Sequence, residues 1–198
     1  MSFFVTRAVS PSGAKPSQDR AAIFARGETA VLVVADGAGG VGDGGAAADL
    51  VLDRVRAAVL DREVDLLAPT TWQRLLGEID RALSGIGETT AVVVALVPGM
   101  LVHASAGDSE AWIVRATDSE RLTTASTRLG TGRARPAAAA RRGLDGRLVV
   151  ATDGLFRHVA REAIEQAARG ERSIADALVA LTHGEDDVAV LVATPDET

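Results

Sequence analysis

Residues 31–40 read Val31-Leu32-Val33-Val34-Ala35-Asp36-Gly37-Ala38-Gly39-Gly40, an apolar run that stops at an aspartate followed by glycine. Five apolar residues in a row, rich in valine, predict a strand buried on both faces. A buried strand holds the side chain at its end at a fixed point on the edge of its sheet. We therefore expect the carboxylate of Asp36 to lie at such an edge.

Four other aspartates stand at the ends of apolar runs. They are Asp19 before residues 21–24, Asp108 after residues 102–107, Asp153 after residues 148–152 and Asp186 before residues 188–193. Carboxylates brought together at one sheet edge would repel one another unless a cation lay between them. Hard oxygen ligands of this kind suit Mg²⁺ or Mn²⁺. The pattern therefore predicts a metal-dependent enzyme.

Composition narrows the class of protein further. The 198 residues fit one large domain, and an apolar content of 47% with only 6 prolines favours a folded globule. A formal charge of −6 offers no long-range attraction to nucleic acid or anionic lipid, and without cysteine there are no disulfides or thiolate metal sites. No uncharged apolar run reaches the roughly 18 residues that span a bilayer, and the first residues do not resemble a signal peptide. We expect a cytoplasmic protein that binds neither nucleic acid nor membrane.

The order of predicted elements favours an α+β fold. Strands are expected at residues 3–9, 21–24, 29–35, 89–97, 101–106, 110–115, 148–152 and 188–193, and helices at 46–60, 72–83, 159–168 and 174–181. This order lacks regular βαβ alternation, so it predicts antiparallel sheets with helix pairs outside them. Thr70 or Thr71 is expected to cap the second helix and Ser173 the last one. Residues 1–198 form a single predicted domain, in which the polar, arginine-rich segment 117–146 is irregular.

The glycines after Asp36 allow a second interpretation. Gly37, Gly39 and Gly42 satisfy G-x-G-x-x-G between a strand and a helix, which can indicate a dinucleotide site. A carboxylate beside the pyrophosphate and a second helix where a parallel strand should follow both count against it. Asp-Gly by itself is also the ordinary signal of a hairpin turn.

Six short blocks, in order from about residue 15 to 194, resemble the metal-dependent protein serine/threonine phosphatases of the PP2C type, the PPM family. The blocks are Ser17-Gln18-Asp19-Arg20, Val34-Ala35-Asp36-Gly37-Ala38-Gly39-Gly40, Glu88-Thr89-Thr90-Ala91, Ala106-Gly107-Asp108-Ser109, Ala151-Thr152-Asp153-Gly154-Leu155 and Asp186-Asp187-Val188. They are similar to the family's Asn-Glu-Asp-Arg, Asp-Gly-x-Gly-Gly, Gly-Ser/Thr-Thr-Ala, Val-Gly-Asp-Ser, Ser-Asp-Gly-Leu and Asp-Asn/Asp-Val segments. The resemblance implies an α-β-β-α sandwich of two mainly antiparallel sheets flanked by helix pairs.

The resemblance also implies a centre of two divalent ions, Mn²⁺ or Mg²⁺, with a third, weaker ion. The residues it assigns to the metals are Asp36 as the bridge, the Gly37 carbonyl, Asp153 and Asp186 in one site, Asp19 through a water, and Asp108 beside the third ion. It makes Asp36, Asp153 and Asp186 catalytic, in a reaction in which a metal-activated water attacks phosphorus. Adjacent acids leave Asp187 or Glu185 as alternatives to Asp186.

The chain departs from the family pattern at several positions. The arginine that grips the phosphate is missing, which leaves Lys15 or Arg20 for that role. Ala38 stands where eukaryotic members carry a histidine, and Glu110 replaces an arginine. The segment 117–146 is short for the family, so we expect a reduced flap over the site.

These features favour a phosphatase acting on phosphoserine and phosphothreonine in proteins, with a serine/threonine kinase as an expected partner. A catalytically weak or inactive regulatory module of the same fold is the main alternative. A nucleotide-binding module using the glycine loop is the third.

Overall fold

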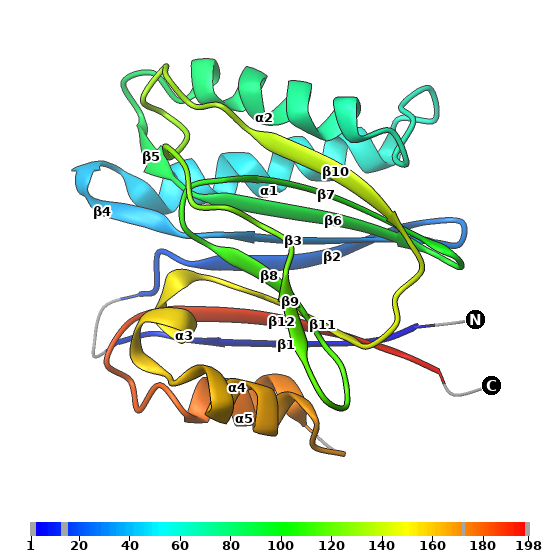
Figure 1. Ribbon diagram of the computed structural model, residues 1–198. Helices are drawn as coiled ribbons and strands as arrows, with labels where there is room; N and C mark the ends of the chain where they lie inside the picture. Colours follow the sequence, from blue (N-terminus) through cyan, green and yellow to red (C-terminus); the bar gives the residue numbers. More distant parts are fainter. Residues whose placement is uncertain (1–2, 13–15, 172, 197–198) are drawn as a thin grey trace.

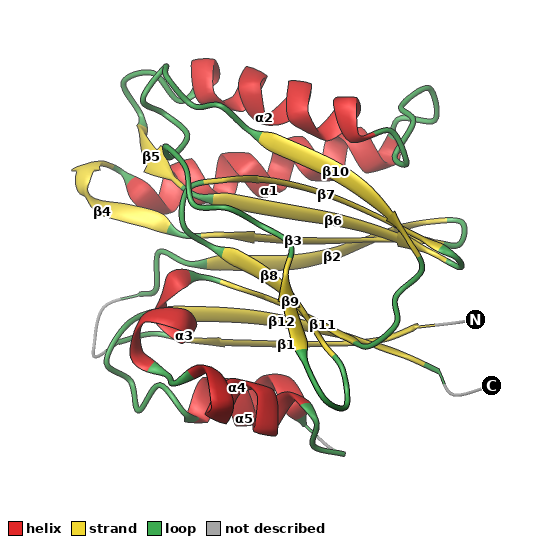
Figure 2. Cartoon of the chain, in the orientation of Figure 1, coloured by secondary structure: helices red, strands yellow, loops and turns green. Residues whose placement is uncertain are grey.

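The computed structural model describes residues 3–12, 16–171 and 173–196, which form a four-layered sandwich (Figure 1). Two sheets pack face to face in the middle. Helices α1 and α2 cover the outer face of one sheet, and α3, α4 and α5 lie against the other (Figure 2). The predicted α+β class, with two antiparallel sheets between helices, is confirmed.

Each central sheet has five strands, and every strand pair is antiparallel. The first sheet has the order β1-β12-β11-β8-β9, and the second has the order β10-β7-β6-β3-β2. Their strands are β1 (Phe3–Ser10), β2 (Arg20–Arg26), β3 (Thr29–Ala35), β6 (Ala91–Val97), β7 (Met100–Ala106), β8 (Glu110–Val114), β9 (Ser119–Arg121), β10 (Ala137–Arg142), β11 (Arg147–Ala151) and β12 (Val188–Pro195). A small third sheet pairs β4 (Gly37–Gly42) with β5 (Gly87–Thr89).

Strand β3 shows why the central strands are apolar at nearly every position. Val31 and Val33 pack in the cluster beneath α1 and α2, whereas Leu32 and Val34 pack between the two sheets. Successive side chains of a strand point to opposite faces, so a strand covered on both faces needs no polar residue. The helices that supply the outer cover are α1 (Gly44–Leu60), α2 (Pro69–Ala82), α3 (Asp153–His158), α4 (Arg161–Ala168) and α5 (Ile174–Ala180).

Two helix starts differ from the sequence-based expectation. Helix α2 begins at Pro69 with Ala68 as its N-cap, so neither Thr70 nor Thr71 caps it. Proline is well suited to the first helical position because its fixed φ matches the helix and its missing N–H leaves no donor unpaired. Ser173 does stand at the N-cap of α5, but its side chain makes no capping hydrogen bond.

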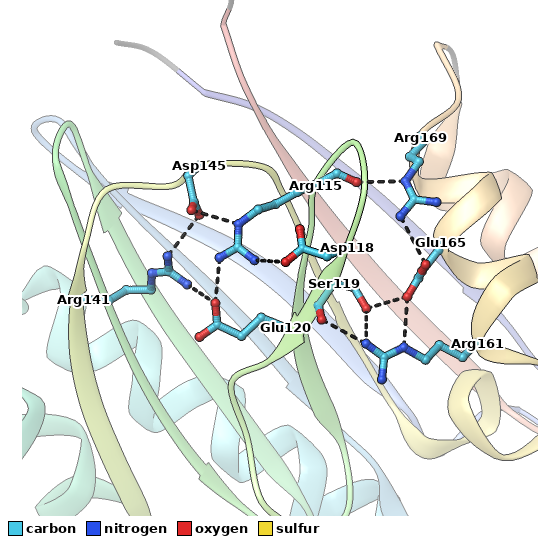
Figure 3. A network of polar contacts seen from close by, with 9 residues as sticks. All are labelled: Arg115, Asp118, Ser119, Glu120, Arg141, Asp145, Arg161, Glu165 and Arg169. Carbon is cyan, nitrogen blue, oxygen red and sulfur yellow. Dashed lines mark hydrogen bonds and ion pairs between the residues drawn. The ribbon is translucent and has the colours of Figure 1, made fainter.

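The segment 117–146 is more regular than its composition indicates. It contains β9, and it contains β10, which pairs with β7 along six residues at the edge of its sheet. Figure 3 shows how polar contacts tie the segment down: Arg115 contacts Asp118, Glu120 and Asp145, and Arg141 contacts the last two of these.

Among the described residues, no helix combines the length and the apolar character needed to cross a bilayer.

Candidate metal centre

Asp36 lies between β3 and β4, and the backbone on both sides of its Cα is fixed by two threonines. Its N–H donates to the Thr90 hydroxyl at 3.0 Å. Its carbonyl accepts from the Thr90 N–H at 2.9 Å and from the Thr89 hydroxyl at 2.9 Å. These bonds explain the two adjacent threonines at the end of β5, because together they hold the residue that bears the central carboxylate.

Thr90 also joins Asp36 to the loop that carries Asp108. The hydroxyls of Thr90 and Ser109 lie 2.6 Å apart, and both side chains are buried. Gly107 has a φ of +93°, and a Cβ there would lie 2.6 Å from the Thr90 Cγ2. Glycine is therefore required before Asp108, both by the backbone conformation and by the close approach.

Asp153 is the first residue of α3, and only Thr152 separates it from the end of β11. Gly154 packs closely against the backbone of Asp187, because a Cβ at Gly154 would lie 2.2 Å from the Asp187 carbonyl oxygen. Phe156 stacks on Trp112 of β8 with ring centroids 5.0 Å apart, which fixes the helix on its sheet. The Trp112 Nε1–H in turn donates to Glu110, so the residue that replaces the family's arginine has a structural partner here.

The acids predicted from strand ends converge. Asp36, Asp108 and Asp153 each offer a carboxylate oxygen, and these oxygens all lie within 4.8 Å of one another. Asp36 and Asp153 line a cleft of about 390 Å³, together with Asp19 and Asp186. The lining includes residues of α3 and β4, which lie at the same end of the sandwich (Figure 1). Residues separated by more than a hundred positions therefore share one site.

Asp19 provides an independent indication that a cation belongs in this cleft. Its side chain is only 4% exposed, and its Oδ2 is buried without a hydrogen-bond partner. The buried Oδ1 of Asp108 likewise has none. Buried carboxylate oxygens are normally paired or bound to a metal, so the donor set fits hard divalent ions such as Mn²⁺ or Mg²⁺.

The carboxylates of Asp19, Asp36 and Asp153 carry the same charge and repel one another. Burial, together with repulsion from Asp19 and Asp153, raises the pKa of Asp36 from 3.8 to about 8. Burial is also the largest cause that raises the pKa of Asp19 to about 7, and the carboxylates of Asp187 and Asp153 add to it. Protein groups therefore do not supply enough positive charge to keep the cluster ionised, and a bound cation would supply it.

Of the neighbouring acids 185–187, Asp186 and Asp187 line the cleft, and Asp186 accepts fewer hydrogen bonds. The Asp186 Oδ1 accepts from the Asp187 N–H at 2.9 Å, and its Oδ2 lies 3.6 Å from both Arg157 and His158. Both oxygens of Asp187 are occupied, Oδ1 by the N–H and hydroxyl of Ser12 and Oδ2 by the N–H of Gln18. Burial alone would raise the pKa of Asp187, but these hydrogen bonds outweigh it and hold the pKa below its usual value. Glu185 is exposed and pairs with His158 at 3.0 Å.

The glycine stretch is extended backbone and does not form a phosphate loop. Residues Gly37–Gly42 pair with β5, and helix α1 starts only after Asp43, whose side chain accepts from the Ala46 N–H at 2.9 Å. Gly37 is required for packing, because a Cβ there would lie 2.3 Å from the Gly44 carbonyl oxygen. The N-terminus of α1, where a dinucleotide's pyrophosphate would bind, is already capped by the Asp43 side chain. The glycine stretch therefore gives no support to the dinucleotide interpretation.

The structure places the two phosphate-binding candidates differently. Lys15 lies outside the described residues. Arg20 is not among the residues that line the cleft, and it binds Asp49 of α1 through two of its nitrogens, at 2.6 and 3.2 Å.

Arg128 lies in the cleft instead, and sequence patterns gave no signal for it. Its guanidinium is 3.6 Å from Asp108. The next residue, Leu129, exchanges two backbone hydrogen bonds with Thr89, and the buried carboxylate of Asp80 accepts from the backbone N–H groups of residues 130, 132 and 134. The loop that carries Arg128 is therefore anchored at several points.

A second arginine, Arg157, also lines the cleft. The sequence does contain a signal for it, because it follows Asp153 by four residues and a helix starting at Asp153 places both on one face.

Comparison with known proteins defines the fold but not the sequence family. No protein-family model matches the sequence, and no curated protein matches it. Among solved structures, the serine/threonine phosphatase Stp1 from Staphylococcus aureus is 18% identical with a TM-score of 0.88, covering 100% of this chain and 96% of that one. A bacterial serine phosphatase is 19% identical with a TM-score of 0.84, covering 98% and 99%.

The catalytic domain of the phosphatase PstP, solved in complex with two manganese ions, is 20% identical with a TM-score of 0.81, covering 96% of this chain and 97% of that domain. These proteins are phosphatases of the PP2C type, and this chain has their fold along its length. The resemblance inferred from the six sequence blocks is confirmed at the level of the fold.

Proposed function

We propose that the chain is a metal-dependent phosphatase that hydrolyses phosphoserine and phosphothreonine in protein substrates. The observation that carries this proposal is the convergence of Asp36, Asp108 and Asp153 within 4.8 Å, beside the orphaned carboxylate oxygen of Asp19. The chain acts as one domain over residues 1–198, with the short segment 117–146 as its reduced flap.

The proposed metal ligands are the acids that border the cleft. By the resemblance, Asp36, the Gly37 carbonyl, Asp153 and Asp186 would hold the two ions, and Asp19 would act through a water. Asp108 stands where the resemblance puts a third, weaker ion. Mn²⁺ or Mg²⁺ held there would lower the pKa of a water and offset charge on the phosphoryl oxygens. Asp187 instead accepts hydrogen bonds from Ser12 and Gln18 and holds these two residues in place.

The protein's remaining task is to hold the phosphate in line. Arg128 is anchored over the cleft and presents a guanidinium, whose planar fork matches phosphate oxygens. In the hydrolysis, a water oxygen forms the new bond to phosphorus while the bond to the serine or threonine oxygen breaks. That oxygen takes its proton from water, since no histidine is among the described cleft-lining residues and Ala38 has no proton to give.

The test uses chelator-stripped protein and two substrates, p-nitrophenyl phosphate and a phosphothreonine peptide, with Mn²⁺ added back. We expect turnover that needs the metal, and a loss in Asp36→Asn larger than the roughly 10–100-fold effect of removing an outer-shell partner. Asp53→Asn is the matched control, because Asp53 is an exposed acid of α1. Turnover that survives chelation, or full activity in Asp36→Asn, would refute the assignment.

One observation favours the second candidate, a regulatory module of the same fold. The guanidinium of Arg157 contacts Asp153 and Asp186, the acids proposed as ligands of one ion. Wild-type protein that binds a phosphorylated peptide but shows no turnover at any Mn²⁺ concentration would support the module. For the enzyme, a cognate serine/threonine kinase and a cytoplasmic site of action are part of the proposal.

A further inference from the structure

The guanidinium of Arg157 lies among three carboxylates that come from three different parts of the chain. Its Nη2 contacts the Asp153 Oδ2 directly and is 4.0 Å from the Asp108 Oδ2, and its Nη1 is 3.6 Å from the Asp186 Oδ2. The side chain projects from α3, which lies at the same end of the sandwich as β4 (Figure 1).

Helical spacing accounts for only one of these contacts. Asp153 and Arg157 are an i,i+4 pair, and an exposed pair of that kind contributes about 0.3–0.5 kcal/mol. The chain has an ordinary example in Arg74 and Glu78 of α2, which are 3.8 Å apart with both side chains more than half exposed. The Asp153 side chain, in contrast, is 12% exposed, and Asp108 and Asp186 belong to loops outside α3.

Arg157 therefore contacts the group of acids that is suited to hold a cation. Asp108 and Asp153 are two of the three residues whose carboxylate oxygens lie within 4.8 Å of one another. A divalent ion would bind these oxygens at about 2.0–2.6 Å. The guanidinium already contacts the Asp153 carboxylate at its Oδ2, so it would repel an ion bound to that carboxylate.

Charge balance favours the arginine over a third ion. Within the described residues, the acids lining the cleft together with Asp108 carry six formal negative charges, and Arg128 and Arg157 carry two positive ones. Two divalent ions offset the remaining four charges. A third ion would leave the centre positive by two, or by one if Arg157 were withdrawn.

We propose that Arg157 is a tethered cation that occupies the position open to a third divalent ion beside Asp108 and Asp153, so that the chain binds two divalent ions and not three. The inference rests on the proposed function, because it assumes that the acids of the cleft bind metal. Arg157 also stabilises the metal-free protein, since it partly neutralises carboxylates that otherwise repel one another.

The test counts bound Mn²⁺ by isothermal titration calorimetry and equilibrium dialysis of chelator-stripped protein. We expect two ions in the wild type and in Arg157→Lys, and a third ion in Arg157→Ala. That third ion should bind at least about tenfold more tightly than any further ion in the wild type, because removal of one like charge at this distance shifts an equilibrium by that much or more. Arg74→Ala is the matched control and should bind two ions.

The melting temperature in EDTA gives a second readout that does not depend on metal. We expect Arg157→Ala to melt several degrees below the wild type, and saturating Mn²⁺ to remove the difference. The same number of ions in the wild type and in Arg157→Ala, whether two or three, overturns the inference while the proposed function stands. A wild type that binds no Mn²⁺ overturns the proposed function as well.

Discussion

The hydroxyl of Thr90 accepts the backbone N–H of Asp36 and lies 2.6 Å from the hydroxyl of Ser109. These two contacts connect the strand end that carries Asp36 with the loop that carries Asp108. Thr90 is fully buried, and Ser109 is 2% exposed. The spacing of the two acids is therefore set by polar groups that water cannot replace.

Thr90→Val keeps the shape of the side chain but removes the hydroxyl. We expect a loss of about 1–3 kcal/mol in the free energy of unfolding, because the Asp36 N–H and the Ser109 hydroxyl lose a buried partner. Mn²⁺ affinity should fall roughly 10–100-fold, as it does when groups that orient metal ligands are lost. Urea unfolding and calorimetric Mn²⁺ titration measure the two effects.

Thr90→Ser is the control, because it keeps the hydroxyl and loses the methyl group that approaches Gly107. It should retain most of the metal affinity and lose about 1 kcal/mol of stability. A serine variant as impaired in metal binding as the valine variant would show that the methyl contact, and not the hydroxyl, holds the acids in place.

Stability of the metal-free protein should fall as pH rises from 5.5 to 8.5. The folded-state pKa values of Asp36 and Asp19, raised mainly by burial to about 8 and about 7, lie above the ordinary value of 3.8. Between those values the folded protein holds protons that the unfolded chain has lost, so a rise in pH favours unfolding by at most about 1.4 kcal/mol per pH unit for each proton.

Melting temperatures in EDTA across this pH range test the prediction. Asp36→Asn should flatten the decline, whereas Asp53→Asn should leave it unchanged. Saturating Mn²⁺ should abolish the decline or reverse it, because the metal binds the ionised carboxylates. A melting temperature in EDTA that is constant or rises over the range would contradict the pKa shifts.

The polar network of Figure 3 should make Arg115 important for stability. Its guanidinium contacts Asp118, Glu120 and Asp145 at 3.2, 2.7 and 2.8 Å, and its carbonyl accepts from Arg169. The hydrogen bonds that Arg115 donates to Asp145 and Glu120 raise the pKa of Arg115, so it is always charged.

We expect Arg115→Ala to cost about 1–3 kcal/mol, more than an isolated surface ion pair, because three carboxylates lose a shared partner. Arg74→Ala removes only an exposed pair and should stay within about 0.5 kcal/mol of the wild type. Urea denaturation provides both values. An Arg115 variant no less stable than the Arg74 variant would show that the network is solvated and adds little.

Much of the fold and the acidic cluster could be predicted because the signals are local. A strand buried on both faces must be apolar at every position, as β3 is, and the aspartate that follows it must stand at the sheet edge. Asp36, Asp108 and Asp153 were therefore recognisable before the structure was known. The hydrogen bonds that favour Asp186 over Asp187 as the proposed ligand were not, because Ser12 and Gln18, which donate them to Asp187, are far away in the sequence.

What sequence patterns missed depends on tertiary context. Strand β10 begins with four alanines, which have a low preference for strands, and it forms because β7 offers a free edge. Helix α3 is too short to show a helical period. Arg128 has no local signal, because its place is set by Thr89 and by the carboxylate of Asp80 on a different element.

Arg128→Ala should weaken phosphate binding at the proposed centre more than it slows turnover. A guanidinium that binds phosphate oxygens in ground and transition state contributes to uniform binding, so its loss raises KM, with kcat/KM expected to fall about 10–100-fold. Assays at saturating Mn²⁺ keep any change in metal affinity out of the result.

Inhibition by inorganic phosphate should weaken in parallel, and Arg128→Lys should recover part of both effects because it keeps the charge. Arg133→Ala, on an exposed arginine of the same loop, is the control and should leave both unchanged. If Arg128→Ala and the wild type are inhibited equally by phosphate, the group that grips the substrate must be sought elsewhere in the chain.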